Sequence, residues 1–146
     1  PLVVAGYRGW GSEALHSRMQ DAQQQGWLRY LGFVSHDVLP LLMAGARLFV
    51  YPSLYEGFGL PVLEAMACGV AVVCSNASTL PEVAGDAAAF HEPADVGALL
   101  TLLRIGLEDS EWRSRAGRKG LAQAAKFSWE RCTQQTLDVY NTVGRA

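Results

Sequence analysis

The sequence predicts an α/β protein with a doubly wound parallel sheet. Two observations lead to this fold class. Short apolar runs alternate with longer helical stretches along the chain, and the runs are apolar throughout instead of alternating with polar residues. Continuously apolar strands suit a sheet covered on both faces, and strands separated by helices imply right-handed parallel crossovers. The chain has 146 residues, 50% of them apolar, which is enough for a single domain over residues 1–146 with its own core.

The predicted elements follow one another in a regular order. Residues 2–6 are expected to form a buried strand that ends in a glycine, and residues 13–25 a polar, exposed helix. Residues 61–68 form a later helix, with Pro61 near its first position, where a missing N–H costs little. Thr79 and Glu82 have the spacing of a capping box at another helix start. The other predicted strands are residues 28–33, 47–51, 70–74 and 87–90, and the other helices are residues 38–44, 96–107, 111–125 and 129–143.

Charge and composition exclude several classes of protein. Twelve Lys and Arg stand against 14 Asp and Glu, so there is no basic excess for binding nucleic acid or a membrane surface. No apolar run approaches the roughly 18 residues of a membrane span. The cysteines are odd in number and lack metal-ligand spacing, so they are expected to be reduced and mostly buried in a cytoplasmic protein: Cys68, Cys74 and Cys132. The histidines are scattered, so we expect no metal site.

The segment between residues 51 and 67 carries the strongest chemical signal. It is predicted to be a strand, a glycine-containing loop and a helix, at the strand end where parallel sheets bind ligands. The helix has Gly59 and Leu60 at its expected cap position, so its first N–H groups lack a side-chain acceptor and form a candidate anion site. Glu56 and Glu64 bracket this site. Because carboxylates repel phosphate and bind hydroxyls well, the pattern indicates a phosphate flanked by two hydroxyl-rich rings, as in a nucleotide-sugar.

This segment also resembles a known family. Residues 56–69 resemble the E-x7-E signature of retaining glycosyltransferases of the GT4 family, which have the GT-B fold. Three further segments resemble motifs of the same family in the same order: residues 30–34, 78–85 and 127–130. The resemblance covers nearly the whole chain, and it specifies neither the sugar nor the base.

The resemblance implies that the chain is the carboxyl-terminal, Rossmann-like half of a GT-B fold, without its first strand–helix unit. Glu56 would be the catalytic residue that holds hydroxyls of the transferred sugar, and Glu64 would hold the ribose hydroxyls. The family uses no metal or other cofactor, and nothing here matches the Arg and Lys that it places upstream. The final helix of the family crosses onto the other domain, so apolar residues at 129–140 are expected to be exposed. The residues whose main-chain amides would contact the sugar and the diphosphate are Gly57, Phe58, Gly59 and Leu60. The residues that would border the base are Val34 and Ser35.

The function implied is transfer of a hexose, with mannose or rhamnose as the first expectation, from a nucleoside diphosphate to a glycan or glycolipid acceptor. The acceptor would bind through an amino-terminal domain that the chain lacks, so the chain alone is expected to transfer no sugar. The parent enzyme is expected in the cytoplasm with a role in lipopolysaccharide or another surface glycan, and its peripheral association with the membrane is left open. The alternatives are a sugar-nucleotide epimerase or hydrolase of the same fold and a non-catalytic nucleotide-sugar-binding module.

Overall fold

A computed structural model describes residues 1–144. All the strands and helices predicted from the sequence are present, with ends within about two residues of those expected, as is usual for helix ends. In chain order the described residues form β1 (Leu2–Ala5), α1 (Glu13–Gln24), β2 (Leu28–Gly32), α2 (Leu39–Ala44), β3 (Phe49–Tyr51), α3 (Leu60–Ala67), β4 (Val72–Ser75), α4 (Leu80–Ala84), the 3₁₀ turn η1 (Gly85–Ala87), β5 (Ala88–His91), α5 (Val96–Glu108), α6 (Ser110–Ala124) and α7 (Trp129–Val143). None of these helices has the length and hydropathy of a membrane span.

The chain folds into two compact units, and the first is Pro1–Leu41. In this unit β1 and β2 pair in parallel, and α1 packs on them through a small core made by Met19, Ala22 and Leu28. The expectation that residues 2–6 form a buried strand is wrong, since Leu2 is 49% exposed and Val3 40%. The reason is that α1 covers one face of this two-stranded sheet and no element of the unit covers the other.

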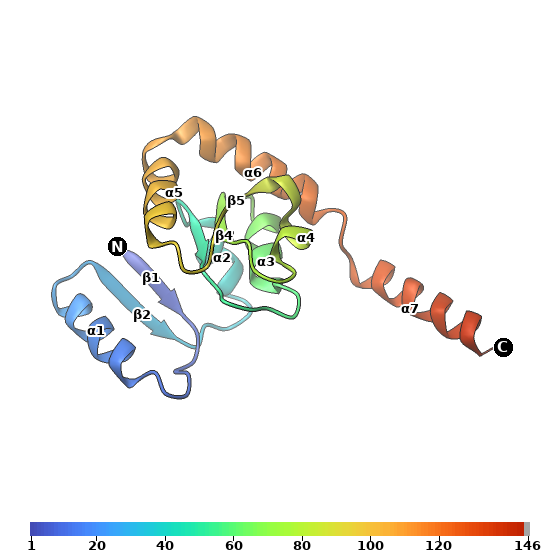
Figure 1. The fold of residues 1–146 in the computed structure, drawn as a ribbon, viewed down its shortest axis with the longest axis horizontal. Helices are drawn as coiled ribbons and strands as arrows, with labels where there is room; N and C mark the ends of the chain where they lie inside the picture. Colours follow the sequence, from blue (N-terminus) through green and yellow to red (C-terminus); the bar gives the residue numbers. More distant parts are fainter. Residues whose placement is uncertain (145–146) are drawn as a thin grey trace. The chain divides into compact units, whose positions relative to one another are not determined.

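The second unit starts at Leu42 and contains a parallel sheet with the order β3-β4-β5. Its central strand, β4, is buried at every residue, as a strand covered on both faces must be. The α/β class and the parallel strand pairing are thus confirmed (Figure 1). The carboxyl ends of β3 and β4 lie side by side, because Tyr51 is in register with Cys74. The loops that leave these two strand ends build the candidate site.

Helices α3 and α6 pack on each other very closely through glycines (Figure 1). A Cβ on Gly117 of α6 would stand 2.3 Å from the carbonyl oxygen of Gly69, just after α3. A Cβ on Gly120 would stand 3.3 Å from the side chain of Met66, which is fully buried. The packing of α6 against α3 fixes the position of α3, and with it the position of the residues at the start of that helix.

Helix α7 has no buried residue. Its exposed apolar side chains include Trp129 at 74% and Tyr140 at 70%, as expected for residues 129–140. One expectation fails on this helix, because Cys132 is exposed whereas the cysteines were expected to be mostly buried. Cys74 on β4 is buried, and its burial raises the pKa of the thiol to about 12.

Candidate functional site

The candidate site is the loop between β3, which ends at Tyr51, and α3, which begins at Leu60. The loop is fixed to the neighbouring strand, because the hydroxyl of Ser75 at the end of β4 donates a hydrogen bond to the carbonyl oxygen of Ser53. Ser75 is fully buried, so this anchor is shielded from water. The loop therefore begins at a defined place on the carboxyl edge of the sheet, where ligands of parallel sheets bind.

The carboxylate of Glu56 is held at this edge by two hydroxyl groups. Its Oε1 accepts hydrogen bonds from Tyr51 Oη at 2.8 Å and from Ser53 Oγ at 2.7 Å. Burial, followed by the bond to Glu56 and its charge, raises the pKa of Tyr51 to about 12, so the phenol stays protonated and acts as the donor. The other oxygen, Oε2, has no hydrogen-bond or ion-pair partner among residues 1–144 and is free to accept one.

The main chain of the loop is held by hydroxyl groups at the start of α4. The N–H of Glu56 donates to Ser78 Oγ at 2.9 Å, and Thr79 Oγ1 donates to the carbonyl oxygen of Phe58 at 2.9 Å. Ser78 has a φ of 47°, a left-handed conformation that is uncommon outside glycine. The capping box expected from Thr79 and Glu82 is wrong, since Thr79 makes no cap bond. Its hydroxyl binds loop carbonyls instead, which the local sequence could not reveal.

Gly59 forms the turn into α3. It has a φ of 102° and is the residue that precedes the helix, with no side-chain cap, as the sequence predicted. A Cβ here would stand 2.5 Å from Cδ2 of Leu80, which is fully buried, so the position accepts only glycine. Within residues 1–144 no hydrogen bond is donated by the main-chain N–H groups that follow Glu56, namely those of Gly57, Phe58, Gly59 and Leu60. Unpaired N–H groups at a helix start attract anions.

Glu64 and Phe58 complete this part of the site. Glu64 lies on the second turn of α3 and is exposed, and its carboxylate has no partner among the described residues. The ring of Phe58 meets Phe127 edge-on at 6.0 Å between centroids, so the segment of residues 127–130 touches the loop. From the sequence, that segment is identified as a family motif at the start of the last helix, and no contact between it and the loop is predicted.

Val34 and Ser35 lie in the first unit, after β2 ends at Gly32. Val34 is half-buried and Ser35 is exposed. The carbonyl oxygen of Ser35 accepts hydrogen bonds from the N–H groups of Val38 and Leu39, which begin the turn into α2. Glu56, Gly57, Phe58, Gly59 and Leu60 thus form one loop that runs into α3, on which Glu64 lies. The binding roles of these residues, and those of Val34 and Ser35, stay predictions.

Hydroxyl residues are what sequence reasoning missed. A usable signal existed, because these residues cluster just at or after the ends of two adjacent strands, where a parallel sheet binds its ligands. They were overlooked since each is unremarkable alone. The hydrogen bonds of Ser75, Ser78 and Thr79 join segments about 20 residues apart, and those of Tyr51 and Ser53 to Glu56 lie within the loop. The residues are Tyr51, Ser53, Ser75, Ser78 and Thr79.

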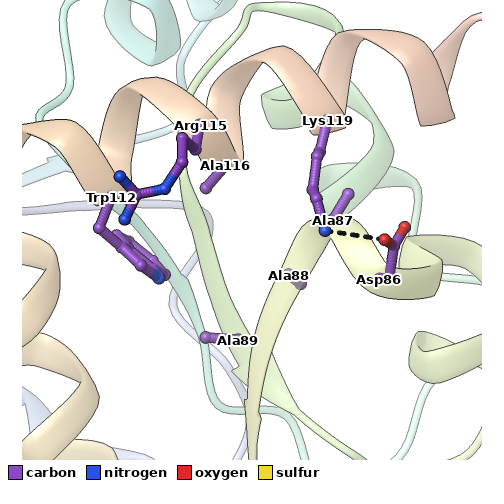
Figure 2. Close-up of a pocket in the computed structure, with 8 residues that line it drawn as sticks. All are labelled: Asp86, Ala87, Ala88, Ala89, Trp112, Arg115, Ala116 and Lys119. Carbon is purple, nitrogen blue, oxygen red and sulfur yellow. Dashed lines mark hydrogen bonds and ion pairs between the residues drawn. The ribbon is translucent and has the colours of Figure 1, made fainter.

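A cavity of about 350 Å³ lies elsewhere in the second unit, between α6 and the start of β5. Figure 2 shows Trp112, Arg115 and Lys119 reaching from α6 over the alanines of β5. Its cations already have partners: Lys119 contacts Asp86 at 2.8 Å and lowers the pKa of that carboxyl group, and Arg115 lies 3.6 Å from Glu111. No residue of the glycine loop lines this cavity, and its groups are less suited to a diphosphate than the unpaired amides are.

Comparison with known proteins gives consistent matches. Residues 1–123 match the family described as glycosyl transferases group 1. The chain is 54% identical over 140 residues to the O-antigen chain mannosyltransferase B of Escherichia coli, covering 96% of this chain and 37% of that protein. It is 45% identical over 102 residues to the serotype-specific mannosyltransferase WbdA of E. coli, covering 70% of this chain and 12% of that protein.

Among solved structures, the chain superposes on the sucrose-phosphate synthase of Thermosynechococcus elongatus with a TM-score of 0.85 and 28% identity. That match covers 99% of this chain and 38% of the other. The chain therefore spans well under half the length of each of these proteins.

Proposed function

Because the chain belongs to the group 1 glycosyl transferases, we propose that it is the donor-binding part of a retaining mannosyltransferase. The parent enzyme transfers mannose from a nucleoside diphosphate to a glycan or glycolipid acceptor, which binds through a domain outside this chain. Mannose is favoured because the two curated relatives described above are mannosyltransferases. Guanine is the proposed base of the donor. The proposed setting is the cytoplasm, in the synthesis of a surface glycan such as lipopolysaccharide.

The observation that carries this proposal is that one loop contains both main-chain amides without hydrogen-bond partners and a carboxylate held in place. The N–H groups from Gly57 to Leu60 lie at the positive end of α3 and suit a diphosphate. Glu56 directly precedes these amides in the chain, and its Oε2, which has no partner within residues 1–144, suits hydroxyls of the transferred sugar. Glu64, exposed on the next turn, suits the ribose hydroxyls. Anion and hydroxyl subsites in this order match a nucleotide-sugar.

In the proposed reaction, the bond between the anomeric carbon and the diphosphate oxygen breaks. The acceptor hydroxyl oxygen bonds to the same carbon and gives its proton to the departing diphosphate oxygen, and the nucleoside diphosphate leaves. Charge accumulates on the diphosphate, so preorganised amides at Gly57 to Leu60 stabilise the transition state more than the ground state. We assign Glu56 to positioning the sugar, and no metal is required because amides and the helix end face the developing charge.

Calorimetry of the 146-residue chain tests this proposal. The chain is titrated with GDP-mannose, GDP, UDP-glucose and UDP in buffer containing EDTA. We expect weak binding that prefers GDP-mannose, no transfer to an acceptor and no release of free mannose. Binding of none of these ligands would contradict the donor-binding role. Release of free mannose would favour a hydrolase, and a parent protein that binds the donor but never transfers it would favour a non-catalytic module.

A further inference from the structure

We propose that Tyr51 and Ser53 are positioning residues that aim the carboxylate of Glu56 at the transferred sugar. The inference rests on the proposed function above, in which Glu56 binds sugar hydroxyls. It adds two residues, neither of which contacts the donor, whose role is to fix the direction in which Glu56 accepts hydrogen bonds. We call the pair of hydroxyls on Tyr51 and Ser53 the hydroxyl clamp.

The clamp acts on one oxygen of the carboxylate. Tyr51 Oη and Ser53 Oγ lie 2.8 Å and 2.7 Å from the same Oε1 of Glu56. A carboxylate has about four acceptor positions shared by two oxygens, so both hydroxyls could have divided between Oε1 and Oε2. Because both bind Oε1, the plane of the carboxylate is fixed and Oε2 is left for a ligand. Bonds of hydroxyls to a charged acceptor are strong enough to hold such an orientation.

The clamp itself is attached to rigid elements. Tyr51 is the last residue of β3, and the carbonyl oxygen of Ser53 is bound by the buried hydroxyl of Ser75 on β4. The main chain of Glu56 is fixed by the two residues before α4: its N–H donates to Ser78 Oγ at 2.9 Å, and Thr79 Oγ1, which donates to the carbonyl oxygen of Phe58, also lies 3.3 Å from the carbonyl oxygen of Glu56. Glu56 is thus held at its N–H, its C=O and Oε1, which is more than a loop residue needs merely to close a turn.

A carboxylate with one fixed free oxygen can discriminate between sugars. Hydroxyls of epimeric sugars point in different directions, so a single acceptor in a set direction binds one epimer better than the other. If one hydroxyl of the clamp is removed, the carboxylate can rotate, and its Oε2 can then accept a hydrogen bond from either epimer. The misplaced sugar still binds, but it is held less often in the reactive geometry. The clamp therefore affects turnover and discrimination more than donor affinity.

The test compares Ser53→Ala and Tyr51→Phe with the unchanged parent protein in a mannosyl-transfer assay. We expect each variant to lower kcat on the order of tenfold, the effect of losing one charge-assisted hydrogen bond. The donor KM should change little, and the preference for GDP-mannose over GDP-glucose should fall. Ser53→Thr keeps a hydroxyl, so its kcat and its preference for GDP-mannose should match those of the unchanged protein. Ser114→Ala is the matched control, because Ser114 is exposed on α6 and, within residues 1–144, its hydroxyl oxygen accepts a hydrogen bond from Arg118 alone.

A double-substitution cycle separates this inference from the proposed function. In Glu56→Gln the amide nitrogen replaces the free acceptor, so adding Ser53→Ala should cause little further loss. Two results would overturn the clamp and leave the proposed function standing. In the first, Ser53→Ala lowers kcat in the Glu56→Gln protein as much as it does in the unchanged protein. In the second, both clamp variants keep their kcat and their sugar preference while Glu56→Gln is inactive. Unchanged transfer in Glu56→Gln itself overturns the proposed site. Thermal unfolding of each variant identifies any loss that comes from misfolding, and Tyr51→Phe and Ser53→Ala give two independent readings.

Discussion

Glu56→Gln in the parent protein is expected to lower mannosyl transfer on the order of a hundredfold. The substitution keeps the shape of the side chain and leaves an oxygen that the hydroxyls of Tyr51 and Ser53 can still bind. What it removes is the second acceptor, because an NH₂ group cannot accept a hydrogen bond. A lost hydrogen bond to a charged group costs about 1.5–3 kcal/mol, which corresponds to roughly 10- to 150-fold in rate.

Glu64→Gln should act differently, since its proposed partner is the ribose and not the reacting sugar. We expect the donor KM to rise about tenfold with a small change in kcat, as for an interaction made equally in the ground and transition states. Glu111→Gln is the control, because Glu111 is an exposed carboxylate on α6 whose partner is Arg115. Steady-state kinetics with GDP-mannose provide the measurement. Equal activity of the Glu56→Gln and Glu111→Gln variants would refute the assignment of Glu56.

Gly117→Ala is expected to be the most destabilising single-methyl addition in α6. The new Cβ would stand 2.3 Å from the carbonyl oxygen of Gly69, and backbone on both sides leaves nothing flexible to move aside. Overpacking of this kind costs about 3 kcal/mol. For a chain of this size each kcal/mol lowers Tm by about 2–4 °C, so we expect a fall of about 6–12 °C in thermal unfolding followed by circular dichroism. Because α6 supports α3, donor binding should weaken as well.

Gly97→Ala is the matched control for this prediction. Gly97 lies in the first turn of α5, and its Cβ would make an ordinary contact at 3.4 Å with the side chain of Asp95. Alanine is also the better helix former by about 1 kcal/mol, so Tm should stay level or rise slightly. Two results would show that the close approach of α3 and α6 does not limit stability: a Tm of Gly117→Ala equal to that of the unchanged chain, or a Tm of Gly97→Ala that falls as far as that of Gly117→Ala.

Local signals in the sequence were sufficient for the elements and for the uncapped start of α3. Apolar runs and their spacing predicted every strand, and Gly59 and Leu60 predicted a helix without a side-chain cap. These features depend on neighbouring residues only. The same reasoning proposed Glu56 as a ligand-binding acid and could not foresee how its carboxylate is held.

The errors involve interactions between distant segments, whereas the omitted bonds from Tyr51 and Ser53 to Glu56 are local and depend on how the loop folds back on itself. Thr79 has the spacing of a capping residue, but its hydroxyl binds the carbonyl oxygen of Phe58, 21 positions away. Leu2 is apolar like a buried residue, yet it is half exposed because one face of its sheet has no cover within its unit. Cys132 is exposed for a related reason, since no residue of α7 is buried. Such outcomes are set by tertiary packing, which a single sequence does not display.

The amide spectrum of the ¹⁵N-labelled chain during titration with GDP-mannose examines the diphosphate site most directly. If the start of α3 binds the diphosphate, the largest shift changes will be those of the N–H groups of Gly57, Phe58, Gly59 and Leu60, since these amides lack partners within residues 1–144. GDP alone should shift the same amides. If the chemical shifts of these four amides do not change while those of amides around the other cavity, such as Ala88 and Ala89, change on addition of the nucleotide, the glycine loop is not the donor site.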